Sequence, residues 1–203
     1  TKPANPTKTG YTFANWYKDS TLKTVWNFST MTVTANTTLY AKWTENTYKV
    51  TYNLNSGAWA SGYTAPTTRK YTKALTLPVA ANIKRTGYTF KGWYTKSDFS
   101  DTAITSIAAK KGNITVYAKW TENTYKVIYT VNGGKWKSGY TAPTTRKYTK
   151  ALTLPTATNI TKTGYKFAGW YTDSKFKTKV TSIVAKKGNV TVYAKWTENT
   201  YKV

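Results

Sequence analysis

The residue types on which most enzymes depend are missing or scattered in this chain. Its 203 residues include no histidine and no cysteine, so Ser-His-Asp, Cys-His and thiolate metal sites cannot be built. Only seven acidic residues are present. Three of them recur at a regular spacing, namely Glu45, Glu122 and Glu198. A hydrolase that works with paired carboxylates needs a second acid at a set separation. We therefore expect no catalytic residue, metal site or cofactor.

A self-made covalent cross-link is the remaining chemistry open to the recurring glutamates. The chain has no cysteine and no glutamine, which excludes thioester and Thr–Gln ester links. A Lys–Asn isopeptide bond with Glu122 as the helper carboxylate stays open. The alternative is that Glu122 is a plain polar residue in a connecting segment.

Aromatic residues beside basic ones are the better candidates for ligand binding. Trp59 and Trp136 lie next to glycine-containing turns, and Lys135 and Lys137 flank the second tryptophan. An aromatic face can stack on sugar rings or bases, and loops often carry function. Tyr94 and Tyr171 follow tryptophans within predicted strands, so we expect the tryptophan to be core and the tyrosine partly exposed. The full set of candidate contacts is Trp59, Trp136, Lys135, Lys137, Tyr94, Tyr171, Arg69, Lys70, Arg146 and Lys147.

The basic charge is distributed along the whole chain. Lysine and arginine number 31, giving a net charge of +24. Residues 44–120 hold 11 basic and 3 acidic residues, net +8, and residues 121–196 hold 14 and 2, net +12. Such surfaces attract polyanions, including wall polymers, sulfated glycans, anionic lipid and nucleic acid. Solubility alone is the competing explanation.

The elements that would position these residues come in repeats. TVYAKWTENTYKV occurs at 115–127 and again at 191–203, and SGYTAPTTRKYTKALTLP occurs at 61–78 and 138–155. A period of about 77 residues predicts an incomplete second half of a module at 1–44, whole modules at 45–121 and 122–197, and the start of another at 198–203. No apolar run is long enough to insert into a membrane as a helix.

Each module is predicted to be mainly β. Residues 48–54, 67–77, 88–94 and 114–120 alternate or are rich in β-branched and aromatic residues, which is typical of strands. Asn55-Ser56-Gly57 and Asn132-Gly133-Gly134 favour positive φ and predict hairpin-type turns. Ile104, Ile107 and Ala108 within 103–112 predict one or two helical turns. The fold class expected is mainly β with one short helix, or α+β.

The repeated motifs resemble a known family. GYTFKGWYT at 87–95 followed by NITVYAKW at 113–120, together with GYKFAGWYTD at 164–173 and GYTFANWYKD at 10–19, is similar to the Listeria–Bacteroides repeat, the B-repeat of internalin B. Asn15 stands where that family usually has glycine. The resemblance implies tandem β-grasp-like modules on a secreted, wall-associated bacterial surface protein without enzymatic activity. The longer first half and the strong basic charge depart from the listerial form.

Three functions are consistent with these features. The preferred one is a stalk or adhesive region that presents basic, aromatic surfaces to an anionic polysaccharide or wall polymer. The second is self-association, in which an incomplete module exposes a strand edge that a neighbour completes. Nucleic-acid binding ranks last because no RNA-binding signature or helix-turn-helix pattern is present.

Overall fold

The computed structural model describes residues 2–201, and these form two compact units. Unit 1 contains residues 1–84 and 90–119, and unit 2 contains residues 85–89 and 120–203. The boundary between the units crosses two long strands, Tyr88–Tyr94 and Ile114–Glu122, because residues 85–89 and the residues from 120 onward belong to unit 2.

The N-terminal part of unit 1 is a two-stranded antiparallel ladder. β1 (Tyr11–Tyr17) pairs with β2 (Tyr40–Glu45), with a register shift between Phe13 and Asn15. The ring of Phe13 packs against those of Trp16 and Trp43, with centroids 5.3 and 5.7 Å away. These contacts form a small aromatic cluster in the N-terminal part of unit 1.

Unit 1 is built mainly on a four-stranded sheet in the order β5-β3-β10-β8. Its strands are β3 (Thr47–Asn53), β5 (Thr68–Lys70), β8 (Tyr88–Tyr94) and β10 (Ile114–Glu122). β3 pairs with β10 in parallel, although β10 lies more than 60 positions later in the chain. Alternation along these strands buries Val50, Trp93, Val116 and Ala118.

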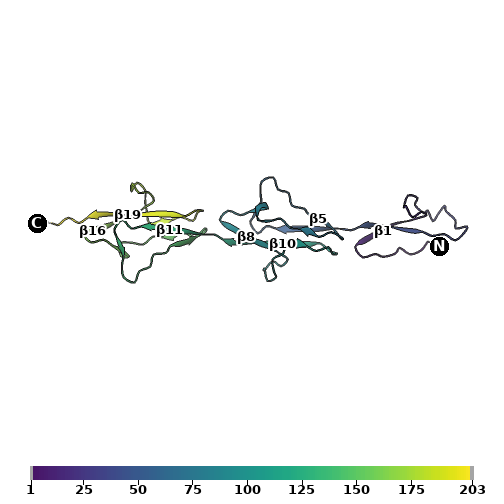
Figure 1. Ribbon diagram of the computed structural model, residues 1–203, viewed down its shortest axis with the longest axis horizontal. Coiled ribbons are helices and arrows are strands. Elements are labelled where there is room, and N and C mark those ends of the chain that lie inside the picture. The colour runs from purple at the N-terminus through teal and green to yellow at the C-terminus, as the bar shows by residue number, and fades with distance from the viewer. Residues whose placement is uncertain (1, 202–203) are drawn as a thin grey trace. The chain divides into compact units, whose positions relative to one another are not determined.

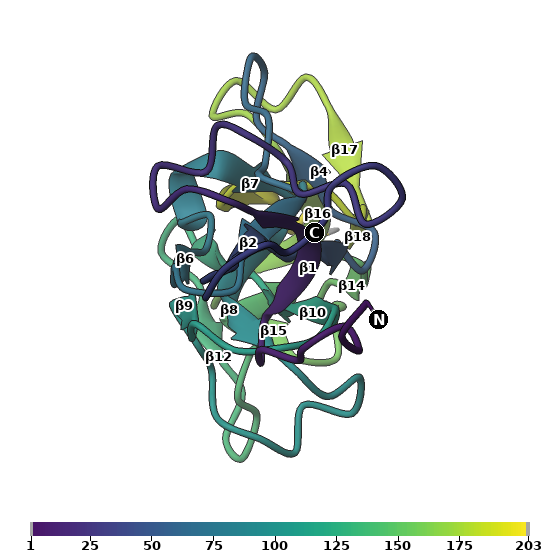
Figure 2. The ribbon, with the colours of Figure 1, turned by 90° about the vertical axis from the view of Figure 1, so that its right-hand side faces the viewer.

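Two short ladders and one helical turn complete unit 1. β4 (Ala58–Trp59) pairs with β7 (Ile83–Lys84), and β6 (Leu75–Thr76) pairs with β9 (Ser106–Ile107), which Figure 2 shows side by side. A 3-10 turn, η1 (Ala80–Asn82), precedes β7.

Unit 2 repeats this arrangement with one further edge strand. Figure 1 shows β11, β16 and β19 together in its central sheet, whose order is β13-β11-β19-β16-β17. Two short ladders, β12–β15 and β14–β18, correspond to those of unit 1. The strands are β11 (Thr124–Thr130), β12 (Lys135–Trp136), β13 (Thr145–Lys147), β14 (Leu152–Thr153), β15 (Ile160–Thr161), β16 (Tyr165–Tyr171), β17 (Lys179–Val180), β18 (Ser182–Ile183) and β19 (Val190–Glu198).

The core of unit 2 lies beneath this sheet and is anchored by one tryptophan. Trp170 is 2 % exposed, and its indole Nε1 donates to the Pro155 carbonyl at 2.7 Å, so its polar atom is satisfied. Trp93 does the same in unit 1, donating to Pro78 at 2.7 Å. The remaining buried members in unit 2 are Val127, Leu154, Ile160, Ile183, Val192 and Ala194.

The structure confirms a mainly β fold and corrects three local predictions. Residues 67–77 form β5 and β6 and not the single strand predicted. Residues 103–112 form no helix. Ile104 instead donates its backbone N–H to Trp93, and Ile107 is buried in β9, so tertiary pairing outweighs the weak helical spacing. Asn55 and Asn132 do adopt positive φ, but their turns close no hairpin, because β4 pairs with β7 and β12 with β15. No helix within residues 2–201 has the length and apolarity to span a bilayer.

Candidate functional site

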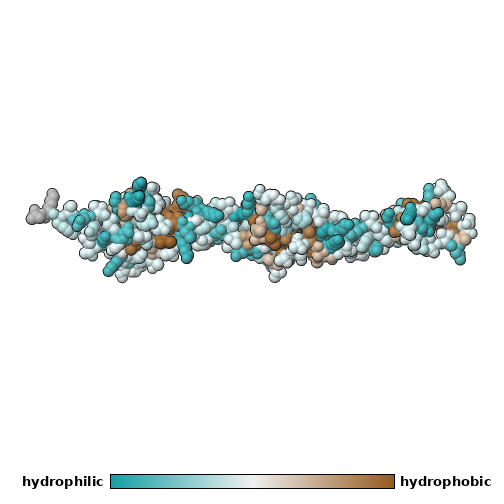
Figure 3. Space-filling view, turned by 45° about the horizontal axis from the view of Figure 1, so that its top comes forward, coloured by the Kyte–Doolittle hydropathy of each residue, from teal (hydrophilic) through white to brown (hydrophobic). Residues whose placement is uncertain are grey.

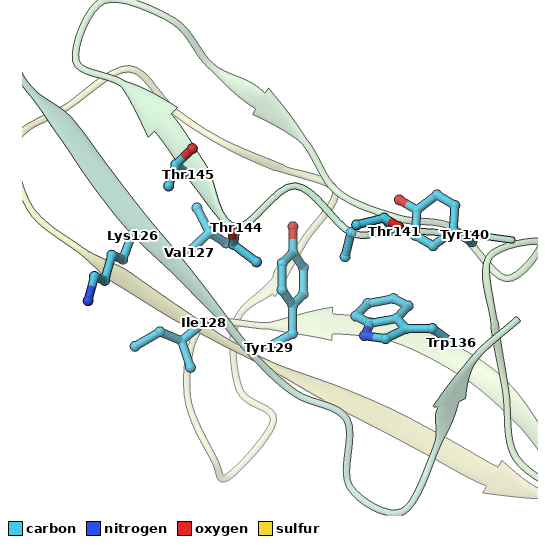
Figure 4. Close-up of a pocket in the computed structure, with 10 residues that line it drawn as sticks. Lys126, Val127, Ile128, Tyr129, Trp136, Tyr140, Thr141, Thr144 and Thr145 are labelled. Carbon is cyan, nitrogen blue, oxygen red and sulfur yellow. The ribbon is translucent and has the colours of Figure 1, made fainter. Parts of the chain in front are cut away.

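An open groove of about 610 Å³ lies on unit 2 between β11, β12 and the loop that leads to β13. Figure 4 shows the Tyr129 and Trp136 side chains next to each other, with Tyr140 and Thr141 above Trp136 and Lys126 at the opposite end. We call this the second groove. Its lining residues are Lys126, Val127, Ile128, Tyr129, Trp136, Tyr140, Thr141, Ala142, Thr144 and Thr145.

The aromatic wall of the second groove is held in place by ring contacts. Trp136 meets Tyr129 edge-on at 5.3 Å between centroids and meets Tyr140 at 5.7 Å. Beneath them, buried Trp170 contacts both Tyr129 and Trp136, at 5.2 and 5.8 Å. These edge-on and tilted ring contacts orient each ring, so the half-buried faces are presented in a preformed arrangement.

A neutral phenol and several hydroxyls supply the polar part of the groove. Tyr129 donates its hydroxyl to the Pro143 carbonyl at 3.1 Å. Burial, with a smaller contribution from Tyr140, raises the pKa of Tyr129 to about 12, so the phenol stays protonated. Thr141, Thr144 and Thr145 are exposed along the rim. The groove therefore combines aromatic faces, hydroxyl donors and one ammonium group.

The first groove, on unit 1, is made by the corresponding residues and holds about 460 Å³. Trp59 contacts Tyr52 and Tyr63 at 5.2 and 5.6 Å, and Tyr52 donates to Pro66 at 3.0 Å. Burial raises the pKa of Tyr52 to about 12 as well. Thr51 stands where the second groove has Ile128, so the corresponding wall of the first groove is less apolar. The lining residues are Lys49, Val50, Thr51, Tyr52, Trp59, Tyr63, Thr64, Ala65 and Thr67.

Two of the predicted ligand contacts line these grooves. The lysines that line them are not the predicted ones. Trp59 and Trp136 line the walls and are half-buried. Lys135 and Lys137 are exposed, but they are not among the residues that line the second groove. The lysines at the grooves are Lys49 and Lys126, on β3 and β11. Sequence reasoning missed them, although their alternation with Tyr48, Val50, Tyr125 and Val127 places them on the solvent side.

Tyr94 and Tyr171 lie outside both grooves and are already covered. Tyr171 packs edge-on against Phe176 at 5.5 Å, and the Lys195 ammonium lies 5.4 Å from its ring centroid. Tyr94 has the same partners in Phe99 and Lys119. The predicted alternation is confirmed, because Trp93 and Trp170 are buried while the tyrosines remain half-buried.

Arg69 and Arg146, two of the predicted ligand contacts, are buried and donate to backbone carbonyls. They are 5 % and 4 % exposed. Arg69 donates to the carbonyls of Lys110 and Gly112, at 2.7 and 3.0 Å, and Arg146 donates to Gly188 at 3.0 Å. Each guanidinium thus holds the loop before the central strand, β10 or β19. Their neighbours Lys70 and Lys147 are exposed, and Lys70 lies 4.0 Å from Glu45.

Glu122, the candidate helper carboxylate for a Lys–Asn bond, has Thr149 as its hydrogen-bond partner. Its Oε1 accepts hydrogen bonds from the Thr149 N–H and hydroxyl at 2.7 and 2.5 Å. These bonds, the hydroxyl first, lower the pKa of Glu122. Glu45 and Thr72 repeat the arrangement. Among residues 2–201, no group of three acidic side chains that could hold a metal ion is found.

Apolar side chains also appear on the surface near these elements. Ile128 at the second groove is 49 % exposed, and Val79 and Val184 are 60 % and 59 % exposed. Figure 3 shows hydrophobic patches surrounded by hydrophilic side chains. Of these three side chains, Ile128 lines the second groove.

Comparison with known proteins assigns the repeats. The Listeria-Bacteroides repeat domain matches residues 1–42, 48–119 and 125–195. Two proteins of Evansella cellulosilytica that carry membrane-protein names are each 34 % identical over the whole chain, which spans 29 % and 22 % of their lengths. Internalin H of Listeria monocytogenes is 39 % identical over 60 % of this chain and 21 % of its own length. No solved structure matches the chain. Because the family's matches extend over nearly the whole sequence, the chain belongs to the Listeria-Bacteroides repeat domain family.

Proposed function

We propose that the chain is a non-enzymatic repeat region of a bacterial surface protein whose grooves hold segments of an anionic glycan or wall polymer. The observation that carries this proposal is the recurrence of one groove at corresponding positions in two repeats. Each groove joins a tryptophan and two tyrosines to threonine hydroxyls and a lysine. Sugar rings stack on aromatic faces, hydroxyls match hydroxyls, and an ammonium pairs with phosphate or carboxylate.

The net charge supports a polyanion as the ligand class. A charge of +24 raises the local concentration of a polyanion around every part of the chain. The grooves then select among polyanions, because a polymer without ring or hydroxyl groups cannot use the aromatic walls. Internalin H and the membrane-protein names of the other relatives support a place at the bacterial surface.

The binding test compares poly(glycerol phosphate), a sulfated glycan and neutral dextran as probes, by isothermal titration calorimetry at low salt. We expect the two anionic probes to bind and dextran to bind far more weakly. Replacing both groove lysines, Lys49→Gln with Lys126→Gln, should weaken binding roughly two- to fivefold per groove, the range expected for exposed ion pairs.

The matched control removes the same charge elsewhere. Lys187→Gln with Lys111→Gln changes two exposed lysines outside both grooves. An equal loss in the groove and control variants would show that only the overall charge matters. Binding that persists unchanged at roughly half-molar salt would contradict the electrostatic part of the proposal.

A further inference from the structure

A tyrosine from one repeat packs against a glycine of the preceding repeat at two places in the chain. The Tyr71 ring covers Gly10, so closely that a Cβ built on that glycine would overlap the ring. Tyr148 covers Gly87 in the same way within unit 2. Each tyrosine also meets a second tyrosine edge-on, Tyr11 at 6.1 Å and Tyr88 at 6.2 Å.

The backbone and a glutamate bind the same turn through hydrogen bonds. At the first place, Tyr71 donates its N–H to the Asn46 carbonyl at 3.0 Å. Thr72 donates its N–H and hydroxyl to Glu45, at 2.8 and 2.5 Å. Tyr148 and Thr149 repeat these bonds with Asn123 and Glu122.

We call each receiving group a socket and each received pair a Tyr-Thr turn. The first socket is Gly10, Tyr11, Glu45 and Asn46, and it receives Tyr71-Thr72. The second socket is Gly87, Tyr88, Glu122 and Asn123, and it receives Tyr148-Thr149. The corresponding residues of the last repeat form a third socket: Gly164, Tyr165, Glu198 and Asn199.

The third socket has the same internal geometry as the other two. Asn199 donates its N–H to the Gly164 carbonyl at 2.9 Å, as Asn46 does to Gly10. The φ of Gly164 is +78°, against +80° at Gly10. Lys162 lies 4.3 Å from the Tyr165 ring centroid, the same distance that separates Lys8 from Tyr11. The backbone of the third socket is therefore already in the receiving conformation.

The position that Tyr71 and Tyr148 take in the other sockets is open within the described chain at the third socket, where the Asn199 side chain donates to the Tyr201 hydroxyl at 3.4 Å. A Cβ built on Gly164 meets nothing within 4 Å among residues 2–201. Tyr165 is 37 % exposed, and Glu198 and Asn199 are exposed where their counterparts are half-buried. An aromatic edge, a carbonyl and a carboxylate thus face solvent in the arrangement that elsewhere receives a Tyr-Thr turn.

We propose that the third socket is a docking site for the Tyr-Thr turn of a further repeat joined in tandem. In both occupied sockets the tyrosine follows the socket asparagine by 25 positions, since 71 − 46 and 148 − 123 both equal 25. Both Tyr-Thr turns of this chain are already bound, so a second copy of it has none to offer. A tandem turn also benefits from the high effective concentration of a linked partner.

One substitution within the third socket is expected to weaken docking there. In the first two sockets a threonine hydroxyl, of Thr12 or Thr89, donates to the side chain of the socket asparagine at 2.6 Å. Lys166 occupies this position in the last repeat. Lysine has no hydroxyl to donate to the Asn199 side chain as the threonines do. Its ammonium group also places a positive charge beside a turn that itself carries lysines.

The test extends the full chain by a copy of residues 128–203 placed directly after Val203, so that residues 201–203 begin the added repeat. Amide hydrogen exchange by NMR then reports on the copied Tyr-Thr turn. We expect its two amides to be protected as those of Tyr148 and Thr149 are. Gly164→Ala should lower that protection about tenfold or more, because a ring contact and two hydrogen bonds are lost together. Lys166→Thr should raise it.

A glycine outside the sockets provides the matched control. Gly139→Ala introduces the same positive-φ strain in open space, at φ +75°, and should leave the copied turn protected. Protection of the copied β11 strand verifies that the added repeat is folded. If the copied turn then exchanges at one rate with or without Gly164→Ala, the proposal is wrong. Sedimentation of the 203-residue chain should show a monomer, and a dimer lost on Gly164→Ala would instead assign the socket to a second molecule.

Discussion

The recurring glutamates Glu45 and Glu122 act at the scale of single residues as hydrogen-bond acceptors for a neighbouring turn. Each carboxylate accepts two bonds from one threonine, Thr72 or Thr149. No catalytic partner is needed to explain why an acid stands at this place in a chain with so few acids. The geometry also makes the turn sensitive to protonation, because a neutral carboxyl is a weaker acceptor than a carboxylate.

Protection of the Tyr-Thr turns should therefore fall in acid. The threonine hydroxyls first, and then the threonine amides, lower the folded-state pKa of Glu45 and Glu122 below the ordinary 4.5. A lowered pKa stabilises the folded contact above the unfolded value, and the stabilisation is lost as pH falls through the folded value. In NMR titrations we expect the chemical shift of the Thr149 amide to keep its hydrogen-bonded value at pH 6. It should lose that value as pH falls through the lowered pKa of Glu122.

A matched variant separates this effect from general acid unfolding. Glu122→Gln keeps a carbonyl acceptor but removes the titration, so the Thr149 amide shift should no longer follow pH while that of Thr72 still does. If both signals are lost together in the variant, the acid transition is general unfolding of both units and not the titration of Glu122.

At the scale of strands and loops, local pattern predicted some elements well and others badly. Alternation over Tyr88–Tyr94 and residues 114–120 predicted β8 and most of β10, because half-buried strands carry a period of two. The two-residue ladders have no such period, and the parallel pairing of β3 with β10 joins residues that no local pattern relates. Threonine-rich residues 67–77 looked like one strand but form β5 and β6, separated by the turn that carries Tyr71.

The residues of the candidate site could also be predicted only in part from the sequence. Trp59 and Trp136 could be found from the sequence, because an aromatic beside a glycine turn is unusual and was expected near the surface. Arg69 could not be distinguished from Lys70 by composition, since both are basic and adjacent. Only the fold shows that the Arg69 side chain points inward to the carbonyls of a loop some 40 positions later.

Arg69 should accordingly matter for stability. We expect Arg69→Met to destabilise unit 1 by ~1–3 kcal/mol, because the Lys110 and Gly112 carbonyls lose their donors. Urea unfolding followed by tryptophan fluorescence measures the change. Lys110→Met removes an exposed charge from the same loop and should change the free energy of unfolding little. Equal effects of the two variants would show that the Arg69 hydrogen bonds contribute nothing specific.

At the scale of the whole molecule, the proposed function predicts that two grooves in one chain bind a polymer more tightly than either groove alone. Each groove is open and small, so a single groove is expected to bind weakly. If the proposed function holds, a polymer long enough to enter both grooves would bind the second as an intramolecular step, which would raise the overall affinity without any new contact. Short oligomers that fill one groove cannot gain in this way.

Ligand length therefore separates true two-groove binding from diffuse charge attraction. Tyr63→Ala and Tyr140→Ala each remove one wall of a groove and leave the net charge unchanged. Against a short anionic oligomer, each single variant should halve the number of sites in calorimetry and leave the affinity of the other groove as it was. Against a long polymer, each single variant should weaken binding by about tenfold or more, because the linked second step is lost. Tyr40→Ala, an exposed tyrosine outside both grooves, serves as control. If all three variants bind long and short ligands alike, polyanions are attracted by the charge of the chain and the grooves take no part.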